Sequence, residues 1–211
     1  LKVHNGKNLL LGQPALALAD PICRAELARF LSQPVRSEED RLTHRLLDHL
    51  AAAGPSSLGS VQLELGVHSR ALRALRHPLE RCGVVVSRQV IVAGDTDSDT
   101  ATATATDRRP GTGGDPGTVG DPVGTGHVHS SELCRYDQLV PTPLAPERDP
   151  HDALEDLVAV GLRAAVLAPE TELARWFSWR WYARPDLLER LVDTGRAVRL
   201  GGGLVAAPLH A

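Results

Sequence analysis

The stretch SRALRALRHPLERCGVVVSRQVIV, residues 69–92, decides the predicted fold. Its leucines recur at helical spacing, which predicts a helix from about Ser69 to Cys82 that ends at Gly83. Pro78 is expected to bend or break the second half of this helix. Residues 84–92 are mostly valine and isoleucine and predict one or two strands.

Two further helices are predicted upstream of this stretch. Ser37 is a good N-cap because three acids follow it, and leucines at helical spacing continue the helix to Gly54-Pro55. A short second helix then runs to Gly66-Val67, which reads as the turn of a helix-turn-helix. Three helices followed by strands are the order of a winged helix, so we expect residues 37–93 to form a first winged-helix unit.

Residues 149–211 repeat this order. Asp149-Pro150 is a cap followed by proline at the first helical position, and an apolar stripe follows. A short helix is predicted over 170–177 and a third over 185–194. Glycines 201–203 join two short strands into a hairpin. The predicted fold class is therefore α+β and mostly helical, with tandem winged helix-turn-helix units.

Three segments lie outside the two units. Residues 94–126 are rich in Thr, Asp, Gly and Pro, with a net charge of -4, and are predicted to be a disordered insertion in the first wing. Residues 127–148 are expected to supply the return strand and a linker. Residues 1–36 are interpreted as the tail of a preceding unit or an N-terminal extension, with a short strand at 9–11 and a helix over 25–31.

The composition allows a buried core, since 42% of the 211 residues are hydrophobic. No stretch is long and apolar enough to span a bilayer, so we expect a soluble, cytoplasmic and nucleoid-associated protein. The chain contains no methionine, so Leu1 is not expected to be a natural start and the chain is expected to be a fragment. Its cysteines, Cys23, Cys82 and Cys134, are expected to be reduced.

A local basic patch stands out against a net charge of -3. Between residues 67 and 92 the only acidic residue is Glu80, and there are five arginines: Arg70, Arg73, Arg76, Arg81 and Arg88. The first three are three residues apart, which predicts one helix face that contacts phosphates or enters a DNA groove. The alternative is a solvated helix face in an arginine-rich proteome, since the chain has 21 arginines and only two lysines, Lys2 and Lys7.

Five of the seven aromatic residues lie between Trp176 and Tyr182. Trp179, Trp181 and Tyr182 are candidates for stacking on unpaired bases, and the interleaved Arg180 and Arg184 are candidate DNA contacts. The alternative is that these rings pack in the core or between the two units.

No metal, cofactor or catalytic residue is predicted. His127 and His129 lie near Cys134, but a zinc site needs four well-placed ligands, so solvent-facing histidines on a strand are expected instead. The chain contains neither a Gly-x-Ser-x-Gly elbow nor a His-Glu-x-x-His motif.

Several segments resemble one protein family: Gly6-Lys7 with 10–14, Ser69–Arg76 with Pro78–Gly83, Ser131–Leu133 with Arg135–Asp137, and Glu172–Trp179. They look like the tandem winged-helix proteins related to the crosslink-repair DNA glycosylases AlkZ and YcaQ. The resemblance implies several winged helices around a concave DNA-binding surface and excision of alkylated purines through a Gln-x-Gln or Gln-x-Asp motif. That motif is missing here, since the nearest strings are Gln62-Leu63-Glu64 and Asp137-Gln138.

We therefore expect a protein that binds double-stranded DNA, in the context of alkylated or crosslinked DNA repair. Two alternatives stay open. One is an active DNA glycosylase whose catalytic motif lies before residue 1. The other is a non-enzymatic winged-helix module that binds a protein partner or acts in transcription.

Deletion of residues 95–125 should tighten DNA binding at low salt, because this acidic insertion follows the arginine helix and would compete with phosphates. Fluorescence anisotropy with a labelled duplex measures the effect. Unchanged affinity would contradict the expectation.

Overall fold

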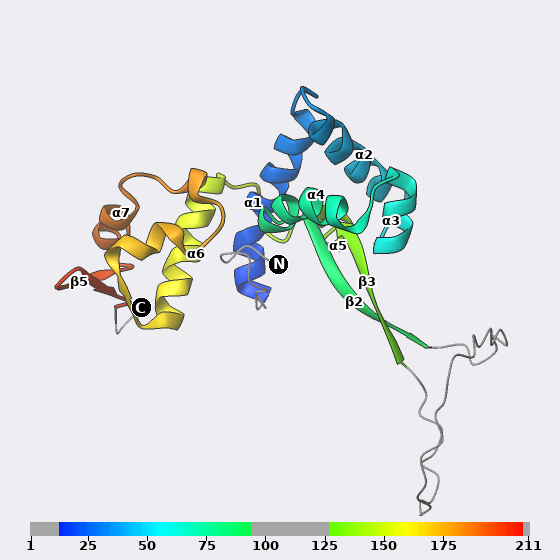
Figure 1. Ribbon diagram of the computed structural model, residues 1–211. Helices are drawn as coiled ribbons and strands as arrows, with labels where there is room; N and C mark the ends of the chain where they lie inside the picture. Colours follow the sequence, from blue (N-terminus) through cyan, green and yellow to red (C-terminus); the bar gives the residue numbers. More distant parts are fainter. Residues whose placement is uncertain (1–12, 94–126, 209–211) are drawn as a thin grey trace, which may run out of the picture. The chain divides into compact units, whose positions relative to one another are not determined.

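The computed structural model describes residues 13–93 and 127–208, with the element order shown in Figure 1. The predicted disorder of residues 94–126 and the predicted strand at 9–11 lie outside these residues. Contacts divide the chain into two compact units, residues 1–88 with 131–211 and residues 89–130. Every contact discussed below lies within the first of these units.

The first group of elements contains five helices and three strands among the described residues. They are α1 (Gln13–Ser32), α2 (Glu38–Ala53), β1 (Ser56–Ser57), α3 (Leu58–Leu65), α4 (Ser69–Arg81), β2 (Val85–Ala93), β3 (His127–Arg135) and α5 (Tyr136–Leu139). The predicted cap of α2 is confirmed. The Ser37 side chain accepts a hydrogen bond from the Asp40 amide, and the Asp40 carboxylate accepts one from the Ser37 amide.

The second group resembles the part of the first group from α2 to β3, with 3₁₀ helices after its first strand. It comprises α6 (Pro150–Ala165), β4 (Leu167–Pro169), the 3₁₀ helices η1 (Glu170–Arg175) and η2 (Arg180–Tyr182), α7 (Leu187–Asp193), β5 (Val198–Gly201) and β6 (Leu204–Ala206). The helix predicted over 170–177 is a 3₁₀ helix that ends at Arg175. The predicted hairpin is confirmed, and Gly201, Gly202 and Gly203 all adopt positive φ in its turn.

Each group contains a three-stranded antiparallel sheet, with strand orders β1-β3-β2 and β4-β6-β5. Two of these strands, β1 after α2 and β4 after α6, were not predicted from the sequence. β1 pairs Ser56 with Leu133, and β4 pairs Ala168 with Val205. Strands this short have no alternation of apolar and polar residues, so only their pairing reveals them. The α+β, mostly helical class is confirmed.

The expected break of α4 at Pro78 is wrong, since the helix continues to Arg81. Proline removes the hydrogen bond that its amide would donate to the carbonyl four residues earlier, here that of Ala74. Ala74 and Pro78 are both exposed, so water can bind near this carbonyl and the penalty is reduced. The buried Leu75 and Leu79 hold the helix on the core on either side of the proline.

Helix α1 begins at Gln13, well before the helix predicted over 25–31, and it joins two hydrophobic cores. Ala19, Ile22 and Cys23 belong to the core that contains α6 and α7. Leu27, one turn further on, belongs to the core that contains α2, α3 and α4. None of the helices within residues 13–93 and 127–208 has the length and apolar composition to cross a membrane.

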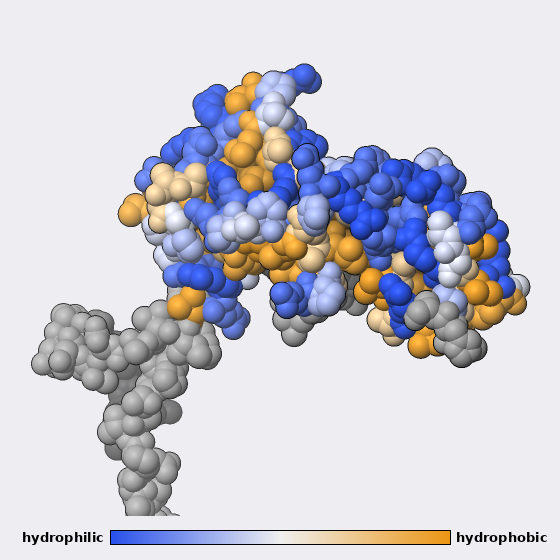
Figure 2. Space-filling model, turned by 180° about the vertical axis from the view of Figure 1, so that it is seen from behind, coloured by the Kyte–Doolittle hydropathy of each residue, from blue (hydrophilic) through white to orange (hydrophobic). Residues whose placement is uncertain are grey.

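Figure 2 shows apolar residues at the surface of the second group of elements, which runs from α6 to β6. Val166, Leu167, Val198 and Leu200 are each at least 44% exposed. Scattered surface hydrophobics are normal in proteins, but three of these four lie on β4 and β5 of one small sheet and Val166 directly precedes β4.

Ile22→Ala should lower the free energy of unfolding by about 2–5 kcal/mol, because Ile22 is fully buried and the substitution leaves a cavity. Urea denaturation measures this change. Leu31→Ala on the same helix is the control, since Leu31 is 40% exposed and its loss should cost well under about 1 kcal/mol. Equal losses for both variants would contradict the role of α1 as a core element.

Candidate nucleic-acid interface

The outward face of α4 carries a row of cationic and imidazole side chains. Arg70, Arg73, His77 and Arg81 are exposed, whereas Leu72, Leu75 and Leu79 on the opposite face are buried. Within the described residues, Arg70, Arg73 and Arg81 form no ion pair. Guanidinium groups without acidic neighbours can exchange solvent for phosphate oxygens at little electrostatic cost.

Arg76 does not belong to this row, although the sequence analysis placed it there. Each step of three residues turns a helix by about 300°, so two steps from Arg70 move Arg76 by about 120° around the axis. Its side chain is 21% exposed and lies 3.8 Å from the Glu80 carboxylate, which is itself buried. The spacing of His77, seven residues after Arg70, could have identified the fourth member of the row.

The start of α4 is fixed by local hydrogen bonds. Gly66 ends α3 in the left-handed region with φ 67°, which glycine adopts without strain. His68 then caps α4, with its Nδ1 accepting a hydrogen bond of 3.1 Å from the Ala71 amide. The turn therefore sets the direction in which Arg70 and Arg73 leave the core.

The other three predicted cationic contacts have different surroundings. Arg88 on β2 is half exposed and binds the Glu132 carboxylate on β3 at 2.8 Å. Arg180 is exposed and has no ion pair within the described residues. Arg184 binds Asp152 and lies close to Asp149 and Glu155, so its charge is already neutralised by α6 and its cap. Of these three, only Arg180 has no acidic partner among the described residues.

The three aromatic residues predicted to stack on bases differ in how far they are buried. Trp179 is fully buried, and its Nε1 donates a 2.9 Å hydrogen bond to the Cys82 carbonyl oxygen. It has no exposed face for a base, which corrects its assignment as a stacking residue and makes it a packing residue. Trp181 is 50% exposed, and Tyr182 is partly buried beside it with the ring centroids 6.1 Å apart.

A buried carboxylate on α1 holds these two rings. Glu26 is fully buried and accepts hydrogen bonds from Trp181 Nε1 and the Tyr182 hydroxyl, both at 2.9 Å, and from Arg29 at 2.7 Å. A buried charge is tolerated where donors of this kind surround it. Burial and the hydrogen bond to Glu26 raise the pKa of Tyr182 to about 12.

Backbone atoms hold Gln138, and the three cysteines are buried. Gln138, from one of the two strings closest to the glutamine motif, bonds to backbone atoms, accepting from the Arg135 amide and donating to the Leu50 carbonyl. No group of three His, Cys, Asp or Glu side chains that could hold a metal occurs in residues 13–93 and 127–208. Burial raises the pKa of the thiols of Cys23, Cys82 and Cys134, which opposes thiolate chemistry.

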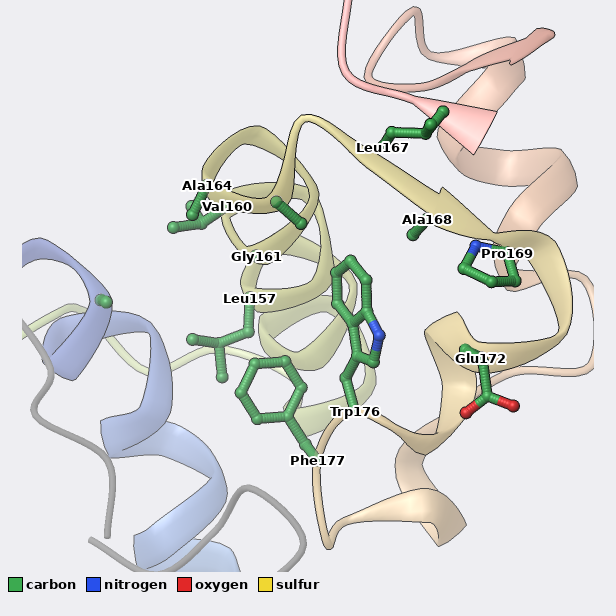
Figure 3. A pocket seen from close by; sticks show the side chains of 12 residues that line it. Leu157, Val160, Gly161, Ala164, Leu167, Ala168, Pro169, Glu172, Trp176 and Phe177 are labelled. Atoms are coloured by element: carbon green, nitrogen blue, oxygen red, sulfur yellow. The ribbon is translucent and has the colours of Figure 1, made fainter. Parts of the chain in front are cut away.

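The second group contains an apolar cavity of about 660 Å³ between α6, β4 and η1, shown in Figure 3. The Trp176 ring lies against Gly161, where a Cβ would come within 3.1 Å of the indole carbons. The only ionisable residue among its described lining is Glu172. This lining suits packing against apolar groups and supplies no acid–base pair.

Comparisons with protein-family models, with curated proteins and with solved structures found no match to this chain.

In the native protein, Tyr182 should titrate near pH 12 rather than near the usual 10. Because its pKa is raised on folding, this contribution to stability is present below pH about 10 and is lost between pH about 10 and about 12. Alkaline titration followed by phenolate absorbance measures it, and Tyr182→Phe should remove this transition. A transition near pH 10 in the folded wild type that Tyr182→Phe removes would contradict the burial of this hydroxyl, since burial also raises the pKa of Tyr136, the other tyrosine.

Proposed function

We propose that the chain is a DNA-binding protein built from two tandem winged-helix units. The order α2, β1, α3, α4, β2, β3 supports the first winged-helix unit, since it gives helix, strand, helix, helix and a strand pair. The order α6, β4, η1, α7, β5, β6 supports the second. In this interpretation α4 is the recognition helix, and the hairpin of β2 and β3 is the wing.

The row of Arg70, Arg73, His77 and Arg81 is the observation that carries the proposal. Its cations leave the protein on the side of α4 that faces away from the core, and the acid within the helix, Glu80, is buried. A helix of this kind can lie along phosphates or enter the major groove. The repair of alkylated or crosslinked DNA is the context that we propose, on the resemblance of sequence segments described above.

Charge reversal of Arg70 and Arg73 tests the proposal. Arg70→Glu with Arg73→Glu should weaken duplex binding by at least about tenfold at low salt and reduce the salt slope by about two units, because two phosphate contacts are lost. The matched control is Arg163→Glu with Arg175→Glu, which changes the net charge equally at two exposed sites of the second group. A gel-shift salt titration measures both variants.

Three outcomes separate the candidate functions. Equal loss in the test and control variants would show that net charge alone drives binding and would contradict the assignment of α4. Release of a base from 7-alkylguanine duplex, seen as abasic sites, would identify a glycosylase. Binding to a protein partner with no affinity for DNA at low salt would identify an interaction module.

A further inference from the structure

A cavity of about 220 Å³ lies at the C-terminal end of α4, where residues far apart in the sequence meet. Its described lining is Pro78, Arg81, Cys82, Ser178 and Trp181. The hydrogen bond from Trp179 Nε1 to the Cys82 carbonyl oxygen fixes the aromatic segment against the end of α4. The cavity therefore brings together Arg81 and Trp181, two of the residues predicted separately as nucleic-acid contacts.

Trp181 is an exposed ring held in one orientation. Half of its surface is exposed, yet its Nε1 is bound to the fully buried Glu26 at 2.9 Å. The Arg29 guanidinium lies 5.8 Å from the ring centroid, within the range of a cation–π contact. An aromatic surface that is fixed before binding loses less side-chain entropy when a flat group stacks on it.

Arg81 and Ser178 are polar residues of the lining, and the Arg81 side chain is open to a ligand. Arg81 is exposed and forms no ion pair within the described residues. Ser178 is 6% exposed, and among the residues that the structure describes its buried hydroxyl has no hydrogen-bond partner. Buried hydroxyls without partners are uncommon, because each loses its bonds to water without replacement. An anion beside Arg81 would complete the site.

We propose that this cavity receives one unpaired nucleotide of a bound strand, with its base stacked on Trp181 and its phosphate beside Arg81. A nucleotide combines the two features that the lining matches, a flat π surface and an adjacent anion. Arg81 also belongs to the exposed row of α4, so a backbone that follows this row arrives at the cavity. The inference rests on the proposed DNA binding and adds a site for a base that has left the base stack of the duplex.

The experiment compares two duplexes that differ by one unpaired base. One is fully paired, and the other carries a single-base bulge in the same sequence. Wild-type protein should bind the bulged duplex about tenfold more tightly, as expected for one stacked base. Fluorescence anisotropy at fixed salt measures both affinities, and thermal unfolding of each variant verifies that it is folded.

Substitutions at position 181 separate stacking from a general effect on the fold. Trp181→Ala should reduce the ratio of the two affinities to about one and change binding of the paired duplex by less than about twofold. Trp181→Phe should keep most of the preference, because it retains a stacking ring without the indole N–H. Arg70→Glu with Arg73→Glu should weaken binding of both duplexes and leave their ratio unchanged.

A wild-type ratio near one, or a preference that Trp181→Ala leaves intact, would overturn the nucleotide site while the proposed DNA binding stands. Unchanged affinity of the Arg70→Glu and Arg73→Glu variant for both duplexes would instead overturn the proposed function. The two failures are therefore distinguishable in one set of titrations.

Discussion

The placement of α1 is the constraint on which the larger unit depends. Its apolar residues enter two cores, and two of its carboxylates, Asp20 and Glu26, are buried and accept hydrogen bonds from distant segments. Asp20 accepts from the Tyr136 hydroxyl at 3.0 Å and from the Leu144 amide at 3.1 Å, while Glu26 accepts from Trp181 and Tyr182. Arg24 and Arg29 on the same helix also pair with these two carboxylates. Losing the distant donors would still remove hydrogen bonds from a buried charge, which favours this position of α1.

The same constraint shapes the surface proposed for nucleic acid. Glu26 accepts a hydrogen bond from Trp181 and fixes its ring. Trp179 donates a hydrogen bond to the Cys82 carbonyl oxygen, which holds the aromatic segment against the end of α4. The arginines of α4 differ in exposure according to their angular position around the helix axis. Those opposite the buried leucines reach solvent, whereas Arg76 turns toward Glu80. An arginine of α4 can therefore contribute to a binding surface only where the packing of the helix on the core directs its side chain into solvent.

Local signals predicted local structure well. Ser37 and Asp149 cap α2 and α6 as expected, because a side-chain acceptor beside free amides needs no distant partner. The glycine turn of β5 and β6 was equally readable. The strands β1 and β4 were not, since each exists only through pairing with a strand much later in the chain. Pro78 was misread because the packing of Leu75 and Leu79 outweighs the propensity of one residue.

The sequence by itself determined the α+β class, most helix ends, the arginine-rich helix and the aromatic cluster, because caps, periodicity and composition act over a few residues. Tertiary structure decided which of these residues are available. It buried Trp179, paired Arg184 with Asp152, exposed Trp181 and placed it beside Arg81. The Arg184–Asp152 pair joins residues 32 positions apart, and the Trp179–Cys82 hydrogen bond joins residues 97 positions apart. Burial and charge pairing at such separations arise only when the chain packs.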